Sequence, residues 1–285
     1  MDNYFVSSCK RVKDWICRQF GQKEKKTVHH KKFADGGEVI VWETGRAGEE
    51  AASYENLFLR KEIAGFRTNI RREQSCSIKS LTRDYLYKQL LSSGEYTFDH
   101  MLVIKDPYGE APLTALALFI LEEPACVRVT TKGNLKETDF VTELPKKKEH
   151  RVPILGMYAE KANDIVIEIL DDEGNCVKSH TFTIRTKRLP KSLRNVITVK
   201  KSAYSNIMIN GGVKIHTCVF DIEGKIRYYL SRKPRGYGIF PLSDGHFFYM
   251  EKYISVPSYS NPQTVESYDM DYFGRVFRTY LTEKG

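Results

Sequence analysis

The chain has 285 residues and a formal net charge of +9, with 41% hydrophobic and 28% charged residues. This balance is ordinary for a soluble protein, and the length leaves room for two domains. No run of 18 apolar residues occurs, and residues 1–20 lack the apolar stretch of a signal peptide, so the sequence predicts neither a membrane span nor a secretory signal.

The basic charge alone is compatible with a nucleic acid, an anionic membrane surface or an anionic substrate as partner. The Lys and Arg residues are spread along the chain, and no nucleic-acid-binding signature occurs. We therefore expect solvated loops and a solvated N-terminal tail, with neither a nucleic acid nor a membrane as partner.

The six cysteines lie far apart and include no CxxC pair, so we expect no zinc site, and nothing in the sequence calls for a cofactor. Cys126, Cys176 and Cys218 lie within or beside strand patterns, and we expect them to be buried as small hydrophobic residues. Reduced thiols and the lack of a signal peptide favour a cytoplasmic location.

Residues 1–93 read as a helical, basic N-terminal region. Residues 1–20 can form a short amphipathic helix, which would either anchor at a membrane surface or, as we favour, pack on the protein or on a second subunit. Residues 21–37 are expected to form a linker, in which the pair His29-His30 lacks further metal ligands and should be exposed.

A short strand is predicted at 38–43, and two helices follow it. The first starts at Gly48; Ser80 is predicted to be the N-cap of the second, which ends at Gly94. We expect these helices to pack against the C-terminal β region or a partner chain.

From Tyr96 the apolar period changes to two, which predicts strands. Short strands with Gly and Pro turns at this spacing are typical of a small β-sandwich, which we place at 94–190. The predicted strands are 96–104, 114–121, 126–131, 140–144, and a pair at 164–170 and 177–186 joined by the loop 171–175.

A second β region is predicted at 191–285. Its strands are separated by turns in which an acidic or aromatic residue precedes Gly; they lie at 214–220, 225–230, 238–242, 246–250, 266–271 and 275–281. A propeller blade is four antiparallel strands in about 40–45 residues, so this region fits one blade and part of a next. Such a start of a propeller leaves an open edge, which a longer chain or a partner would cover.

Two irregular motifs mark the β-sandwich region. Residues 106–116 read Asp-Pro-Tyr-Gly-Glu-Ala-Pro-Leu-Thr-Ala-Leu, a rigid turn followed by a buried strand, and residues 150–158 read His-Arg-Val-Pro-Ile-Leu-Gly-Met-Tyr. Together they resemble the N-terminal β domain of the arylsulfate sulfotransferases. Residues 220–230 and 267–276 are similar to the first pieces of that family's propeller.

The resemblance implies a mainly β chain with N-terminal helices, an Ig-like β-sandwich and the first blade or so of a six-bladed propeller that continues beyond this chain. It implies a transferase that moves a sulfuryl group from an aryl sulfate to a phenol through a histidine intermediate. The family carries this histidine on later blades, so we expect no catalytic residue of the family here and an inactive chain on its own. The rest of the propeller, or a second subunit, is the implied partner.

The other candidate residues are few. His246, after a Gly turn, is the best histidine; we expect His100, His150, His180 and His216, like His246, to be satisfied by local hydrogen bonds. Arg235 and Tyr237 flank Gly236 and could meet an anionic aromatic substrate, the alternative being a plain loop.

Other enzyme signatures do not occur: GxGxxG, the P-loop, HExxH and GxSxG are all missing. The carboxylate pairs Glu122-Glu123 and Asp171-Asp172 are expected in exposed turns. The alternative function is a non-catalytic β-sandwich module that binds a partner chain or an anionic ligand.

Overall fold

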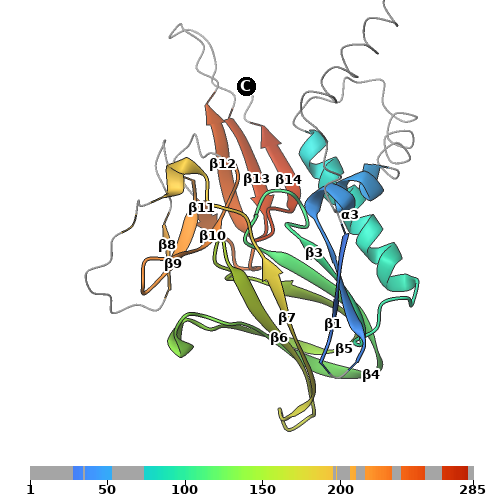
Figure 1. Cartoon of the computed structure of the whole chain (residues 1–285). Helices are drawn as coiled ribbons and strands as arrows, with labels where there is room; N and C mark the ends of the chain where they lie inside the picture. The colour runs from blue at the N-terminus through green and yellow to red at the C-terminus, as the bar shows by residue number, and fades with distance from the viewer. Residues whose placement is uncertain are drawn as a thin grey trace, which may run out of the picture.

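The computed structural model describes residues 28–34, 36–52, 74–194, 197, 206–209, 216–232, 239–253 and 265–281. These residues form a mainly β protein, with one large curved sheet, two smaller sheets and the long helix α3 (Figure 1). The predicted helix at 1–20 and the predicted site residues Arg235 and Tyr237 lie outside the described residues.

The large sheet has seven strands, ordered β1-β2-β3-β4-β6-β7, with β5 paired to β4. The parallel pair in this sheet is β2 with β3, and the other pairs are antiparallel. The bounds are β1 Val28–Lys32, β2 Glu38–Trp42, β3 His100–Lys105, β4 Ala115–Thr131, β5 Phe140–Ile154, β6 Ala162–Leu170 and β7 Cys176–Arg185.

The strand β4 explains the shape of this sheet. Its first part pairs with β3 and its last part with β6, while β5 follows it along its length. The sheet bends where the register of β4 and β5 shifts, between Ile120 and Val127. We predicted two strands at 114–121 and 126–131; they are one continuous strand, so the expected two-sheet sandwich is a single curved sheet.

The two ends of the curved sheet approach each other. Lys31 of β1 donates to the Thr183 hydroxyl of β7 at 2.7 Å, and the Phe33 ring lies 6.3 Å from that of Phe182. The sheet is therefore a nearly closed barrel, and the alternating apolar residues of its strands fill the interior, among them Val41, Met101, Val103, Phe119, Val129, Ile165 and Ile184.

The N-terminal region contributes to this barrel, which differs from the predicted organisation. β1 occupies residues that we expected to be a linker, and β2, at the predicted position, pairs with β3. The sheet thus crosses the predicted domain boundary at residue 94.

The helix α3, Gln74–Ser92, covers the outer face of the barrel, where Leu86, Tyr87 and Leu91 meet the apolar side chains of Leu102 and Leu116. Figure 1 shows that α3 also lies beside β14. Ser80 was predicted to be an N-cap, which is wrong because the helix begins six residues earlier. Its buried hydroxyl instead accepts a hydrogen bond from the Val276 backbone N–H at 2.9 Å.

The C-terminal residues form two antiparallel sheets, of which the three-stranded one shares the core of the barrel through Cys218, Ile226 and Tyr229. The three-stranded sheet is ordered β10-β9-β8 and the four-stranded sheet β11-β12-β13-β14. Their bounds are β8 Asn206–Ile209, β9 Cys218–Asp221, β10 Ile226–Tyr229, β11 Ile239–Pro241, β12 Phe247–Tyr253, β13 Val265–Met270 and β14 Val276–Leu281. The predicted strands of this region are confirmed, whereas β8 was not anticipated.

Three hairpin turns have the same hydrogen bonds. They start at Asp171, Asp221 and Asp271, and in each the Asp backbone C=O accepts from the Gly three residues later. The Asp side chain also accepts from the backbone N–H groups two and four residues later. The three glycines have φ between 72° and 85°, the left-handed region that favours Gly. The predicted acidic-then-Gly turns are therefore confirmed.

Two smaller predictions are corrected. Cys218 is buried as expected, but Cys126 is only partly buried and Cys176 is exposed because it opens β7 at the hairpin loop. Glu122 and Glu123 are exposed, yet they lie within the irregular middle of β4 and not in a turn. Within the described residues no helix is long and apolar enough to span a membrane.

Candidate functional site: the interface between the barrel and the C-terminal sheets

The two sequence motifs of the barrel meet at one side chain of α3. Asp84 accepts hydrogen bonds from the Tyr108 hydroxyl at 2.5 Å and from Arg151 at 3.3 Å, and its other oxygen lies 2.7 Å from Arg275. We call these four residues the Asp84 cluster. It joins the 106–116 motif, the 150–158 motif, the helix and the β13–β14 turn, and two guanidinium groups pair with its one carboxylate.

The turn that carries Tyr108 is held by α3. The backbone C=O of Pro107 accepts hydrogen bonds from the Tyr87 hydroxyl and from Arg83. Gly109 has φ of 81°, and the Asp106 carboxylate accepts from the Ala111 N–H at 2.9 Å. Burial raises the pKa of Asp106 to about 6. The predicted rigid turn is thus fixed by its own backbone and by the helix.

A second contact buries a charged side chain between the barrel and β9–β10. The Arg227 guanidinium donates to the backbone C=O of Gly156 at 2.7 Å and of Thr138 at 2.8 Å, and lies 3.2 Å from the Asp221 carboxylate. Its centre is 3.9 Å from the Tyr158 ring centroid, and the Tyr158 hydroxyl donates to Asp221 at 3.0 Å. We call Arg227, Asp221 and Tyr158 the Arg227 cluster.

The charged side chains of the Arg227 cluster are almost completely buried, and this determines their structural role. Arg227 is 3% and Asp221 1% exposed, so neither charge is solvated by bulk water. Removing one partner of such a pair costs about 3–5 kcal/mol because the other charge remains buried. The cluster therefore fixes the position of the three-stranded sheet on the barrel.

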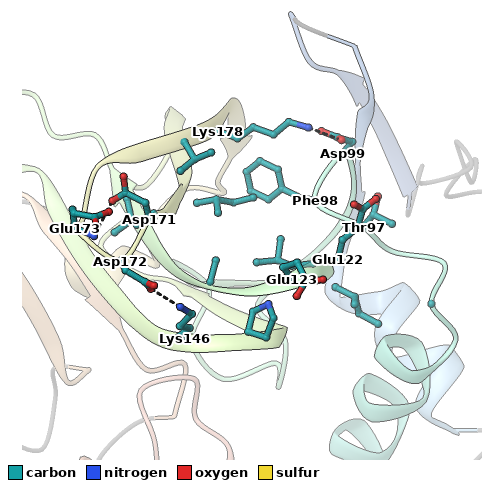
Figure 2. Close-up of a pocket in the computed structure, with 18 residues that line it drawn as sticks. Thr97, Phe98, Asp99, Glu122, Glu123, Lys146, Asp171, Asp172, Glu173 and Lys178 are labelled. Carbon is teal, nitrogen blue, oxygen red and sulfur yellow. Dashed lines mark hydrogen bonds and ion pairs between the residues drawn. The ribbon is translucent and has the colours of Figure 1, made fainter.

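The open end of the barrel holds a cavity of about 790 Å³ (Figure 2). Six carboxylates and two lysines line it, and both lysines form ion pairs, Lys178 with Asp99 at 2.6 Å and Lys146 with Asp172. Figure 2 shows Phe98 inside this ring of charged residues. Backbone hydrogen bonds from Asn175 lower the pKa of Asp171. The cavity is acidic, so its charge disfavours an anionic ligand.

Four of the histidines have hydrogen-bond or ion-pair partners, but not all of these partners are local in sequence as we expected. His150 and His216 are buried against backbone carbonyls, while His100 and His180 lie beside Glu38 and Asp99. Burial lowers the pKa of His150.

His246 has the most suggestive geometry. Its Nδ1 lies 3.0 Å from the Asp269 carboxylate, its ring stacks on Phe277 at 3.9 Å, and its side chain is 25% exposed. A carboxylate that fixes one imidazole nitrogen orients the other, which is the arrangement a nucleophilic or basic histidine requires.

Metal ligands do not gather in the described part of the chain, where no group of three or more His, Cys, Asp or Glu side chains is placed to hold an ion. His29 and His30 are each near a single carboxylate, Glu43 at 3.6 Å and Glu38 at 3.2 Å; the His30 side chain is exposed and the His29 side chain partly exposed.

Sequence reasoning missed both clusters. Asp84 belongs to no motif that we recognised, and its partners lie 24 to 191 positions away in the chain. Arg227 lies in the segment 220–230, where no role was predicted for it; its partners Asp221 and Tyr158 are 6 and 69 positions away. A usable signal was present for Arg227: a charged residue stands in the middle of the apolar strand 226–230, where burial requires a partner.

The described residues form a β barrel, which carries both motifs, and two further β sheets. They therefore have the architecture of a multi-sheet β protein. Within it, residues 102–187 match the family model of the arylsulfotransferase Ig-like domain, which includes Tyr108, Arg151 and Tyr158. Residues 102–187 therefore carry this domain, in the part of the chain where the two motifs predicted it. A search of curated proteins gave no match.

Proposed function

We propose that this chain is the N-terminal portion of an arylsulfate sulfotransferase. In this proposal a sulfuryl group passes from an aryl sulfate to a phenol through a histidine carried on propeller blades beyond this chain, and no cofactor takes part. The observation that carries the proposal is the family match over 102–187. We further propose a cytoplasmic location, supported by the three free cysteines of the described residues.

The proposed organisation is an Ig-like domain, whose barrel β1 and β2 complete from the N-terminal region, followed by the start of a six-bladed propeller at 191–285. The antiparallel sheet β11–β14 supports the last assignment, because its four strands run consecutively from Ile239 to Leu281, close to the roughly 40–45 residues of a blade. The Asp84 and Arg227 clusters would then hold this first part of the propeller on the barrel.

The test is sulfuryl transfer from 4-nitrophenyl sulfate to phenol, followed by the release of nitrophenol. We expect no turnover by the 285-residue chain, and turnover when the chain is extended by the coding sequence that follows Gly285. An extended chain that folds and gives no turnover would refute the proposal. Turnover by the 285-residue chain that disappears in His246→Ala would place the nucleophile at the His246–Asp269 pair instead.

The second candidate is a non-catalytic module that binds a partner chain. The acidic cavity at the open end of the barrel favours a basic partner segment over an anionic ligand. Titration with a lysine-rich peptide in low salt separates the two functions, because only the module predicts saturable binding that weakens when Glu122 and Glu123 are both changed to Gln.

A further inference from the structure

A second cavity, of about 340 Å³, lies where the barrel, the connector after β7 and the β9–β10 turn meet. Ala159 and Glu160 line it just before β6, Leu189 and Leu193 line it from the connector, and Ile226 lines it from the start of β10. This volume is in the range of small-molecule sites and is sufficient for one ring with a short substituent.

The apolar residues that line this cavity belong to the barrel core or pack against it. Leu193 is 1% and Ile226 6% exposed, and both are members of the core. Ala159, Leu189 and Ile197 are partly buried and pack against the same core. A ligand can therefore bury an apolar body on a surface that the fold already holds in place.

Four charged residues line the cavity, and three of them are cationic. The Arg188 Nε lies 3.4 Å from the Glu160 carboxylate, so these two charges balance each other. Arg194 and Lys225 have no carboxylate partner in the part of the chain that the structure describes. The cavity therefore combines an apolar surface with two positive charges that no described carboxylate balances, which favours an anionic ligand.

The guanidinium group of Arg194 is positioned by the cavity lining itself. Its Nε donates to the backbone C=O of Leu189, another lining residue, at 2.9 Å. This bond leaves Nη1 and Nη2 without a partner among the described residues, and Arg194 is partly exposed. The two nitrogens belong to one rigid planar group, so together they can hold both oxygens of a single carboxylate without help from a second side chain.

The remaining charges and the apolar surface exclude other kinds of ligand. A cation would be repelled by Arg194 and Lys225, and a neutral ring would cover part of the guanidinium without replacing its water. A small inorganic anion would leave the apolar surface of Leu193 and Ile226 uncovered. Only an anion with an apolar body uses both features of the cavity.

We propose that this cavity binds a small organic carboxylate with a single apolar ring, its two oxygens on Arg194 Nη1 and Nη2 and its ring on Leu193 and Ile226. The inference does not depend on the proposed sulfuryl transfer, which is assigned to a histidine beyond this chain. A ligand here contacts both the connector and β10, so its binding also stabilises the contact between them.

The test titrates the full chain with four probes and follows the NMR shifts of the Leu193 and Ile226 amides. Benzoate carries both the ring and the charge, benzamide lacks the charge, acetate lacks the ring, and benzylammonium reverses the charge. We expect benzoate to bind about three- to tenfold more tightly than benzamide and at least about tenfold more tightly than acetate, with benzylammonium the weakest of the ring compounds. Added NaCl should weaken the binding of benzoate and leave that of benzamide unchanged.

Three results would refute the proposal. Equal affinity for benzoate and benzamide would mean that the cavity recognises apolar surface alone. Equal affinity for benzoate and acetate would mean that it is a plain anion site. No saturable binding of benzoate, or binding that leaves the Leu193 and Ile226 amides unshifted, would mean that the cavity is not a carboxylate site.

Variants locate the binding site. Arg194→Gln removes the fork, so benzoate affinity should fall about three- to tenfold while benzamide affinity stays the same. Lys225→Gln, at an exposed turn position that tolerates the change, should weaken benzoate binding about twofold. Lys148→Gln makes the same change of charge on β5, outside the cavity lining, and is the matched control. Leu189→Trp fills the cavity and should abolish benzoate binding. Unchanged benzoate affinity in folded Arg194→Gln, or in both Lys225→Gln and Leu189→Trp, would overturn the inference.

Discussion

Asp106 combines a left-handed backbone conformation with a buried carboxylate. It has φ of 46°, and its carboxylate accepts the Ala111 N–H inside the turn at the start of the 106–116 motif. Burial raises its pKa to about 6, above the value near 3.9 of an unfolded chain. The folded protein therefore takes up a proton that the unfolded chain has already released.

This shift predicts a pH dependence of stability. Between about pH 4 and 6 the native state binds more protons at Asp106 than the unfolded state, so the contribution of this group to the free energy of unfolding falls as the pH rises and is constant above about pH 6. Asp106→Asn removes this titration and retains an acceptor oxygen for Ala111. We expect the variant to gain roughly 1–3 kcal/mol relative to the unaltered chain between pH 4 and 7.

Urea unfolding at several pH values measures this difference. Asp164→Asn, at an exposed position of β6, is the control and should give a flat difference. Asn readily adopts a positive φ, so the substitution can also change the free energy of unfolding by the same amount at every pH. The prediction therefore concerns only how the difference in free energy of unfolding changes with pH. A flat difference for Asp106→Asn would show that the carboxylate is solvated in the native state.

The sequence predicted the local geometry of this turn and not its surroundings. Two prolines and Gly109 restrict the backbone wherever the segment lies. That Tyr108 reaches Asp84 depends on the position of α3, which only the packing of Leu86 and Tyr87 on the barrel determines.

At the scale of elements, the three Asp-to-Gly turns are locally alike but differ in what surrounds them. A Cβ on Gly274 would lie 2.3 Å from the Glu110 Cβ, whereas a Cβ on Gly174 would meet nothing within 4 Å. Glu110 cannot easily move away, because its carboxylate pairs with Arg232 at 2.9 Å. The turn at Asp271 is therefore packed against the 106–116 motif, whereas the turn at Asp171 has open space beside Gly174.

This contrast gives a matched pair of variants. Gly174→Ala should lose about 1 kcal/mol of stability from the positive φ alone. Gly274→Ala should lose this plus about 1–3 kcal/mol from overpacking against Glu110. Chemical unfolding of both variants measures the difference. Equal losses would mean that the β13–β14 turn does not press on the motif.

At the scale of the whole molecule, the barrel depends on strands from outside the family-matched region. β2 pairs with β3 over five residues, and Val39 and Val41 pack in the same core as Met101 and Val103. Without β1 and β2, the edge of β3 and one side of that core would face solvent.

We therefore expect a chain that starts at residue 43 to be aggregated or molten, with lost near-ultraviolet circular dichroism. A chain that starts at residue 28 retains every described strand and should unfold cooperatively. Comparing thermal unfolding and gel filtration of the two chains makes the test. A cooperative transition from the chain that starts at residue 43 would show that the family-matched region folds without its N-terminal strands.

The sequence by itself determined the β class, the turns and the arylsulfotransferase Ig-like domain at 102–187, because these depend on local period, on Gly and Pro positions and on two contiguous motifs. The tertiary structure alone decided that β4 bridges two halves of one sheet, that β1 and β2 complete it, and that Asp84 and Arg227 hold the C-terminal sheets. These features join residues far apart in the chain, and nothing in the local pattern of a strand specifies its distant neighbour.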